Sequence, residues 1–180
     1  LSTLVRFLDE HPKAGAVGPM VLNEDGTLQY SWARFPTIAS ELAGRLDRRI
    51  DSPLCRPSTA SEVRGLGPFS VGWIGGCCLM IKRAAIEQIG LLDESLFMYS
   101  EEMDWCLRLH KTGWEVWVQP AAEIVHLGGR SSDQAPRETS EYLRRSKAAY
   151  FDKHSGRAAG VLVRAILAAK SGLRGLRKAT

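Results

Sequence analysis

The sequence predicts an α/β fold that ends in amphipathic helices. Short apolar runs typical of strands alternate with segments of helical periodicity, and Gly and Pro residues separate them. Residues 141–180 repeat apolar side chains at helical spacing among many basic ones. The length of 180 residues and an apolar content of 44% suffice for a buried core in a globular protein.

The first part of the chain reads as helix, strand and hairpin. Residues 1–10 have an amphipathic helical pattern that ends at His11-Pro12. Residues 16–22 form an apolar strand, and an Asp-Gly turn then leads into a returning arm at residues 27–32. Residues 33–68 are punctuated by Pro, Gly and Ser, which predicts an irregular segment with one short helix.

Regular structure resumes after Gly75-Gly76. Residues 77–81 are expected to form a buried strand, and a helix at residues 84–89 ends at Gly90. A second helix follows at residues 98–111, with Ser100 as a suitable N-cap, and two short strand-like runs come next.

Charge and cysteine content narrow the class of protein. Residues 142–180 hold ten Lys and Arg against one acid, a net charge of +9, whereas residues 1–141 carry −5. A basic tail favours an anionic partner such as a membrane surface, and nucleic acid is disfavoured because few aromatic residues lie among its charges. The cysteine spacing fits reduced thiols in a cytoplasmic protein, and no apolar run reaches the roughly 20 residues of a spanning helix.

Three carboxylates cluster at the start of the predicted helix: Glu101, Glu102 and Asp104. Acids in a first helical turn complement the helix dipole, and this structural explanation is favoured on physical grounds alone. The same dipole favours the ionised form, so a carboxylate here could accept a proton from a substrate hydroxyl. Asp104 lies four residues before Arg108 and is expected to pair with it.

Two further features have structural and functional interpretations. His126 follows a strand-like run and precedes Gly128-Gly129, where a histidine is more often structural than a metal ligand. Trp73-Ile74-Gly75-Gly76 fits either a tight bend or a place where a ligand approaches the backbone against an aromatic platform.

The run "VGWIGGCCLMIKRAAIEQIGLLDESLFMYSEEMDWCLRLHKTGWEVWVQPAAEIVHLGGRSS" resembles the second half of family 2 glycosyltransferases, especially the rhamnosyltransferase-like branch. Upstream, "LVRFLDEHPKAGAVGPMVLNEDGTLQYSWARFP" resembles the segment that follows the metal-binding Asp-x-Asp of that family. The resemblance covers residues 1–155 in order. It implies a partial GT-A fold, a Rossmann-like α/β sandwich with a mixed sheet, over residues 1–140, and a basic helical tail at residues 141–180.

The resemblance also assigns roles. Glu102 matches the general base, at a position where Asp is commoner, and His126 matches a ligand of the Mg²⁺ or Mn²⁺ ion that binds the donor diphosphate. The residues implied to bind the acceptor are Trp73, Gly75, Gly76, Glu101 and Asp104. The residues implied to cover the donor diphosphate are Arg130 and Ser131.

The expected function is that of the acceptor half of an inverting glycosyltransferase. Its parent enzyme would move a sugar, such as rhamnose, from a nucleotide-diphosphate donor to a glycan or lipid-linked acceptor, in cell-envelope polysaccharide synthesis at the inner face of the plasma membrane. Because the Asp-x-Asp half is not in the sequence, we expect the chain to be the back half of a longer protein and inactive alone. The alternative is a non-catalytic module that binds a membrane surface through the basic tail.

Overall fold

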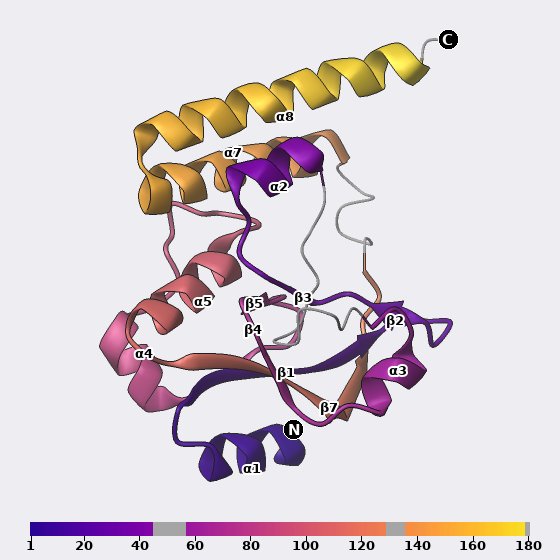
Figure 1. Cartoon of the computed structure of the whole chain (residues 1–180), viewed down its shortest axis with the longest axis vertical. Coiled ribbons are helices and arrows are strands. Elements are labelled where there is room, and N and C mark those ends of the chain that lie inside the picture. Colours follow the sequence, from indigo (N-terminus) through magenta and orange to yellow (C-terminus); the bar gives the residue numbers. More distant parts are fainter. Residues whose placement is uncertain (45–56, 129–135, 179–180) are drawn as a thin grey trace.

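The computed structural model describes residues 1–44, 57–128 and 136–178, and in the last range it describes side chains from residue 138 to residue 171. Within these ranges a mixed sheet has helices on both faces, and a pair of long helices forms a further layer above it (Figure 1). The predicted α/β class is confirmed, and the architecture is consistent with a partial Rossmann-like GT-A domain.

The sheet is built around two parallel strands, β1 (Ala14–Leu22) and β7 (Glu115–Val125). Strands β2 (Leu28–Gln29) and β6 (Met80–Ile81) pair antiparallel with different parts of β1, and β4 (Phe69–Val71) pairs antiparallel with β7. Every residue of β1 is buried. A strand with neighbours on both edges and helices on both faces needs apolar residues throughout, which explains the continuous apolar run in the sequence.

The pairing of β7 with β1 is irregular at two places, at Gly15 and after Pro19. Gln119 pairs with Pro19 and Glu123 pairs with Met20, so residues 120–122 have no counterpart on β1. The sequence predicted two short strands here, whereas the structure has one long strand with an irregularity between the two predicted runs.

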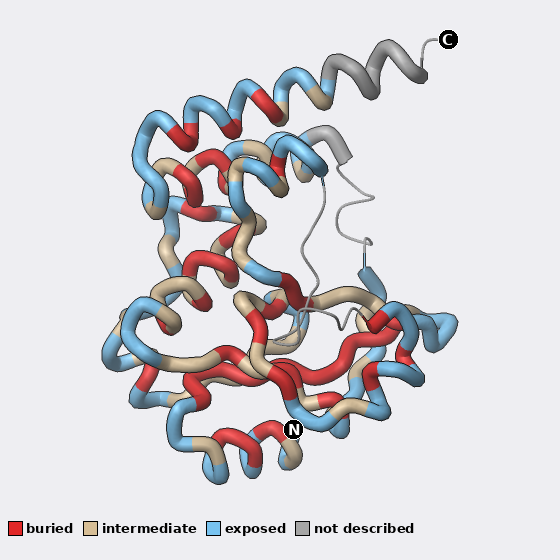
Figure 2. The backbone as a smooth tube through the Cα atoms, in the orientation of Figure 1, coloured by how far each residue is buried: buried red, intermediate tan, exposed pale blue. Residues whose placement is uncertain are grey.

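Two apolar clusters sandwich the sheet. Helix α1 (Ser2–Glu10) packs Leu4, Phe7 and Leu8 against one face of β1. The opposite face carries the larger core, to which α5 (Glu101–Lys111) contributes Cys106 and Leu109. Figure 2 shows the buried residues concentrated along the sheet and on the helix faces turned toward it.

A third cluster joins α5 to the two C-terminal helices. Helix α7 (Pro136–Ser155) is followed by α8 (Arg157–Lys178), and the chain reverses between them at Gly156, which has φ 90°. Tyr150 and Phe151 of α7 pack with Val163 of α8 and Met103 of α5. In the part of the chain that the structure describes, no helix is both long enough and apolar enough to cross a bilayer.

The remaining elements are short. β3 (Trp32–Ala33) pairs with β5 (Trp73–Ile74), and three short helices complete the fold: α2 (Ile38–Ala43), α3 (Ala60–Arg64) and α4 (Arg83–Ile89). The sequence did not predict α3, although a reciprocal capping box between Thr59 and Glu62 marks its start. The buried strand predicted at residues 77–81 was wrong in extent, because only Met80 and Ile81 pair and both are half-buried.

Candidate active site

The first turn of α5 is directed toward the edge where the parallel strands end. Helix α5 ends at Lys111 and β7 begins at Glu115, so the helix folds back along the strand that follows it. The start of α5 and the carboxyl end of β7 therefore lie on the same side of the fold. Ligands of open α/β sheets bind outside the carboxyl ends of the strands.

The chain enters α5 through a strained backbone. Tyr99 and Ser100 have φ values of 66° and 69°, a left-handed conformation that costs an L-residue about 1–2 kcal/mol. Ser100 occupies the predicted N-cap position, but its side chain makes no capping hydrogen bond. Strain of this kind persists where the surrounding structure imposes it, and it is commonly found at functional sites.

A cavity of about 260 Å³ opens beside this turn. Its walls are largely apolar and aromatic, and its lining includes Trp73, Tyr99, Met103, Leu143, Glu102 and Lys147. These residues come from β5, from the turn before α5, from α5 itself and from α7. An apolar pocket with a few polar groups is the usual form of a small-ligand site.

Glu102 is the acid of this cavity. Its Oε2 atom is buried and accepts no hydrogen bond within the described residues. Burial, followed by the negative charge of the neighbouring Glu101, raises the pKa of the Glu102 carboxyl to about 7. The helix dipole was expected to keep this carboxyl ionised, but burial and the charge of Glu101 outweigh the dipole. A carboxyl with a pKa near neutrality is well matched to general-base catalysis.

Lys147 places a positive charge in the same cavity. Its Nζ atom lies 2.9 Å from Oε1 of Glu41, a buried carboxylate on α2. The ion pair connects α7 to α2. The cavity is therefore lined by one acidic side chain, Glu102, and one basic side chain, Lys147, from distant parts of the sequence.

The glycine bend lies against the cavity. Trp73 lines the cavity, and its indole nitrogen donates to the carbonyl of Arg34 at 3.2 Å. A Cβ atom on Gly76 would lie 4.0 Å from Cβ of Glu102, so these two residues are neighbours. The backbone N–H of Gly75 donates to the carbonyl of Ser31 at 2.7 Å and holds the bend in place. The structure therefore gathers Trp73, Gly76 and Glu102 at one place.

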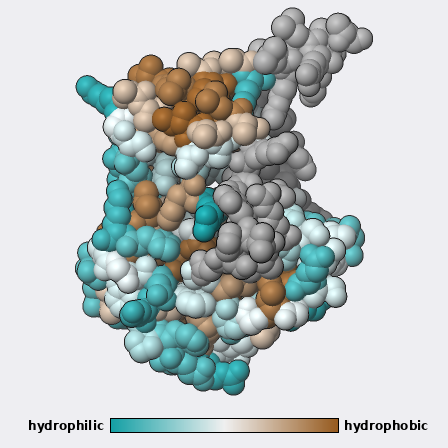
Figure 3. Space-filling view, in the orientation of Figure 1, coloured by the Kyte–Doolittle hydropathy of each residue, from teal (hydrophilic) through white to brown (hydrophobic). Residues whose placement is uncertain are grey.

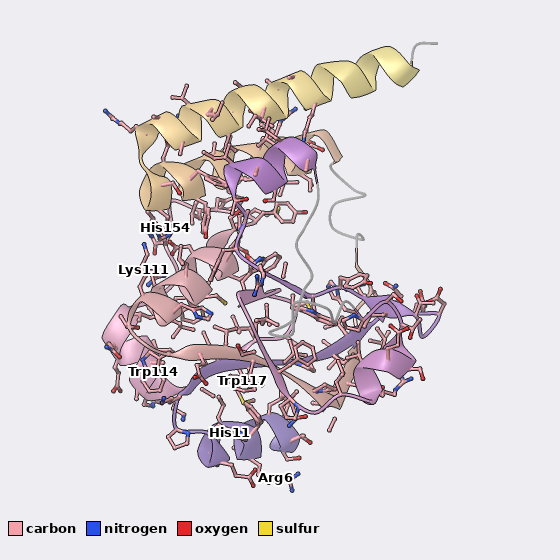
Figure 4. The ribbon with its side chains drawn as sticks, in the orientation of Figure 1. Arg6, His11, Lys111, Trp114, Trp117 and His154 are labelled. Atoms are coloured by element: carbon pink, nitrogen blue, oxygen red, sulfur yellow. The ribbon has the colours of Figure 1, made fainter. Side chains whose placement is uncertain are left out.

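Asp104 belongs to a different environment. It is fully buried, its Oδ2 accepts from Arg108 at 2.9 Å, and its Oδ1 lies 2.6 Å from Nε2 of His154 and 2.8 Å from Nζ of Lys153. Burial alone would raise the pKa of Asp104, but these hydrogen bonds lower it below its ordinary value. Figure 4 shows His154 beside Lys111, whose Nζ lies 3.0 Å from the Nδ1 atom of His154. The expected Arg108 pair is confirmed and lies within α5, whereas Oδ1 of Asp104 joins α5 to α7 through Lys153 and His154.

His126 lies just beyond the end of β7 and is oriented by Gln29 of β2. Nε2 of Gln29 donates to the Asn23 side-chain carbonyl at 2.8 Å and to the His126 backbone carbonyl at 3.1 Å. The amide orientation leaves Oε1 of Gln29 as the acceptor that lies 2.6 Å from Nδ1 of His126. Nδ1 must then carry the proton, and Nε2 has the free lone pair that a metal ligand requires.

His126 and Glu102 do not touch each other. An 11-residue helix is about 16 Å long and an 11-residue strand about 36 Å, so β7 carries His126 well past the first turn of α5. Among the described residues, no group of three or more His, Cys, Asp or Glu side chains could hold a metal ion. Arg130 and Ser131, predicted to cover the donor, lie outside the described residues.

Three residues of this site were not predicted from the sequence. Tyr99 and Lys147 line the cavity, and Gln29 fixes the tautomer of His126. No motif or spacing marks them, because they reach the site only through the strained turn, the α5–α7 packing and the β1–β2 hairpin.

The fold and the cavity define a partial Rossmann-like α/β domain with a buried acid in a cavity that β5, α5 and α7 line. The chain is 32% identical over 163 residues to an N-acetylglucosaminyl-diphospho-decaprenol L-rhamnosyltransferase from two strains of Mycobacterium tuberculosis, covering 87% of this chain and 52% of that protein. It is 37% identical over 51 residues, 28% of this chain and 17% of the relative, to the low-salt glycan biosynthesis hexosyltransferase Agl10 from Haloferax volcanii. No family model matches the chain.

These matches relate the chain to family 2 glycosyltransferases, as the sequence motifs predicted. The chain spans about half the length of the rhamnosyltransferases that it matches.

Proposed function

We propose that this chain forms the acceptor side of an inverting glycosyltransferase, with Glu102 as the general base. The observation that carries the proposal is the buried Glu102 carboxyl, whose pKa is raised to about 7, at the wall of a 260 Å³ cavity. The similarity to glycosyltransferases over 87% of the chain supports the reaction class.

In the proposed reaction Glu102 removes the proton from an acceptor hydroxyl as the hydroxyl oxygen attacks the anomeric carbon of the donor sugar. The attack comes from the face opposite the departing nucleoside diphosphate, so the configuration at that carbon inverts. The acceptor sugar would lie against Trp73 beside Gly76. The apolar C–H face of a sugar ring can stack on an aromatic side chain, and a glycine allows close approach to the backbone. A volume of 260 Å³ suits one sugar ring better than a longer glycan.

Among the described residues, His126 has the chemistry of one ligand of a Mg²⁺ or Mn²⁺ ion. Nε2 of His126 has its lone pair free because Gln29 fixes the proton on Nδ1. A bound divalent ion would neutralise the donor diphosphate as it leaves. The remaining ligands would come from the diphosphate and from acids outside these described residues, so the His126–Gln29 pair is this chain's contribution to the metal.

For the donor and acceptor we propose a nucleotide-activated sugar such as rhamnose and a lipid-linked glycan. The support is the name of the M. tuberculosis relatives, which includes a rhamnosyl group and N-acetylglucosaminyl-diphospho-decaprenol. We propose a role in the synthesis of a cell-envelope polysaccharide, which a lipid-linked acceptor of this kind would support.

The deciding experiment is Glu102→Gln in the full-length protein. The change keeps the shape of the side chain and removes the base, so transfer to the acceptor is expected to fall by about 10²–10⁴-fold. Binding of the nucleotide sugar, measured by calorimetry, is expected to change little. Glu94→Gln is the matched control, because Glu94 is an exposed acid in the segment between α4 and α5. Undiminished transfer by Glu102→Gln would refute the assignment.

A further inference from the structure

Helix α8 has a second apolar face that the fold does not use. Its inner face buries Ala159, Val163 and Ile166 against the rest of the protein. On the outer side Val161 is 59% exposed and Leu162 is 45% exposed, and three exposed alanines lie near them along the helix: Ala165, Ala168 and Ala169. Figure 3 shows hydrophobic side chains gathered over the described part of α8, in the upper part of the view. We define the outer face of α8 by these five residues.

The charge of the helix limits what can cover this face. The 22 residues of α8 include six Lys and Arg and no Asp or Glu. Arg157 and Arg164 lie on α8 and are exposed. A helix with an exposed apolar face, basic residues beside it and no acids matches a surface that is itself apolar inside and negatively charged outside.

A basic groove borders the outer face. A cavity of about 410 Å³ lies between α7 and α8, and Arg144, Arg145, Arg164 and Ala168 are among its lining residues. Arg145 pairs with Glu141 and Arg164 pairs with Asp152, whereas Arg144 donates to the neutral hydroxyl of Ser171 at 3.0 Å. Among these three arginines of the groove, Arg144 is the one that donates to an uncharged side chain within the described residues. Since Ala168 belongs to both the groove and the outer face, one flat surface could contact both.

We infer that the outer face of α8 docks on an anionic phospholipid bilayer, with the groove at Arg144 receiving lipid phosphate. Val161 and Leu162 enter the boundary between headgroups and acyl chains, and the flanking arginines lie at the level of the phosphates. The inference goes beyond the proposed function, because docking requires neither Glu102 nor a sugar donor. It gives the protein a peripheral position at the surface where a lipid-linked acceptor would reside.

The test is flotation of the full-length protein with two kinds of vesicle. One contains phosphatidylcholine alone, and the other contains phosphatidylcholine with phosphatidylglycerol. Binding is expected on the anionic vesicles, with a partition coefficient at least about tenfold higher than on the neutral ones. The double variant Val161→Glu and Leu162→Glu is expected to lower that coefficient by about tenfold or more, since it removes apolar burial and adds negative charge.

The control variant is Leu91→Glu with Leu92→Glu, two leucines that are 76% and 45% exposed in the segment between α4 and α5. It is expected to float like the wild type. Equal binding to neutral and anionic vesicles, or unchanged binding of the α8 variant, would overturn the inference. Sedimentation velocity without lipid provides a further check: a dimer that the α8 variant dissociates would mean that a second copy covers this face, and the inference would be wrong. A glycosyl-transfer assay on the same samples shows whether vesicle binding and sugar transfer are lost independently. Failure of the docking inference can then be told apart from failure of the role proposed for Glu102.

Discussion

The charge of Glu101 controls the titration of Glu102, so Glu101→Gln is expected to shift the pH dependence of catalysis. The pKa of Glu102 is raised from 4.5 to about 7, first by burial and then by the charge and hydrogen bond of Glu101. The whole shift corresponds to about 3 kcal/mol at 1.36 kcal/mol per pKa unit. Removing Glu101 leaves the burial in place, so we expect the pKa of Glu102 to fall by about one unit.

The consequence is largest on the acidic side of neutrality. With a pKa near 7 about 9% of Glu102 is ionised at pH 6, and with a pKa near 6 about half is ionised. The rate constant kcat/KM at pH 6 is therefore expected to rise about fivefold in Glu101→Gln, while the rate at pH 8 changes little. Initial rates of sugar transfer between pH 5 and pH 9 measure this. A midpoint that stays unchanged in Glu101→Gln, with Glu94→Gln as control, would refute the coupling between the two acids.

The same pair predicts a change in stability that needs no substrate. Because the folded pKa of Glu102 is raised, its contribution to stability is fully present below pH 4.5 and is lost as the pH rises through about 7. Glu102→Gln is therefore expected to raise the melting temperature at pH 8 and to have little effect at pH 4. Thermal unfolding at the two pH values measures this, and an equal shift at both would contradict the raised pKa.

Three further predictions concern residues outside the cavity. Gln29→Leu is expected to weaken Mn²⁺ binding by about 10–100-fold, because Nδ1 of His126 loses its acceptor; calorimetry on the full-length protein measures this, and unchanged affinity would contradict the proposed ligand role. Asp104→Asn is expected to lower the free energy of unfolding by about 3 kcal/mol or more at pH 7, because Arg108 and Lys153 lose a buried counter-ion. This loss is expected to become smaller as the pH falls below 3.8, where the wild-type carboxylate itself begins to be protonated. Denaturant unfolding at pH 7 and pH 3 tests both expectations. Gly72→Ala is expected to destabilise the fold by about 1–3 kcal/mol, since a Cβ there would lie 2.8 Å from the backbone nitrogen of Phe35; a melting temperature equal to that of the wild type would contradict the contact.

The alternation of apolar runs and helical periodicity was sufficient to predict the α/β class. The extents of β1, α1 and α5 follow from local pattern, because a buried strand needs apolar residues throughout and an amphipathic helix needs them at every third or fourth position. Predictions made where pairing partners decide the structure were less accurate. Residues 77–81 look like a buried strand in sequence, yet only two of them find a partner on β1.

The candidate site also has residues that were predicted from the sequence and contacts that were not. The family resemblance assigned Glu102 and Trp73 to the site, whereas their local patterns also fitted a structural role, and both residues line one cavity. Asp104 lies in the same helical turn as Glu102, but its side chain points in another direction and contacts Arg108 and His154. The four-residue spacing predicted the Arg108 pair of Asp104, whereas its contact with His154 and the burial of Glu102 depend on tertiary neighbours that the sequence does not show.

The sequence alone thus determined the fold class, the family relationship and the identity of the acid at the start of α5. Only the tertiary structure decided the protonation of that acid, since the pKa of Glu102 depends on burial beneath α7 and on the position of Glu101. It also decided that Gln29 fixes the tautomer of His126 and that Lys147 enters the cavity. A side chain's type is local, whereas its charge state and hydrogen-bond partners depend on residues that come together only when the chain folds.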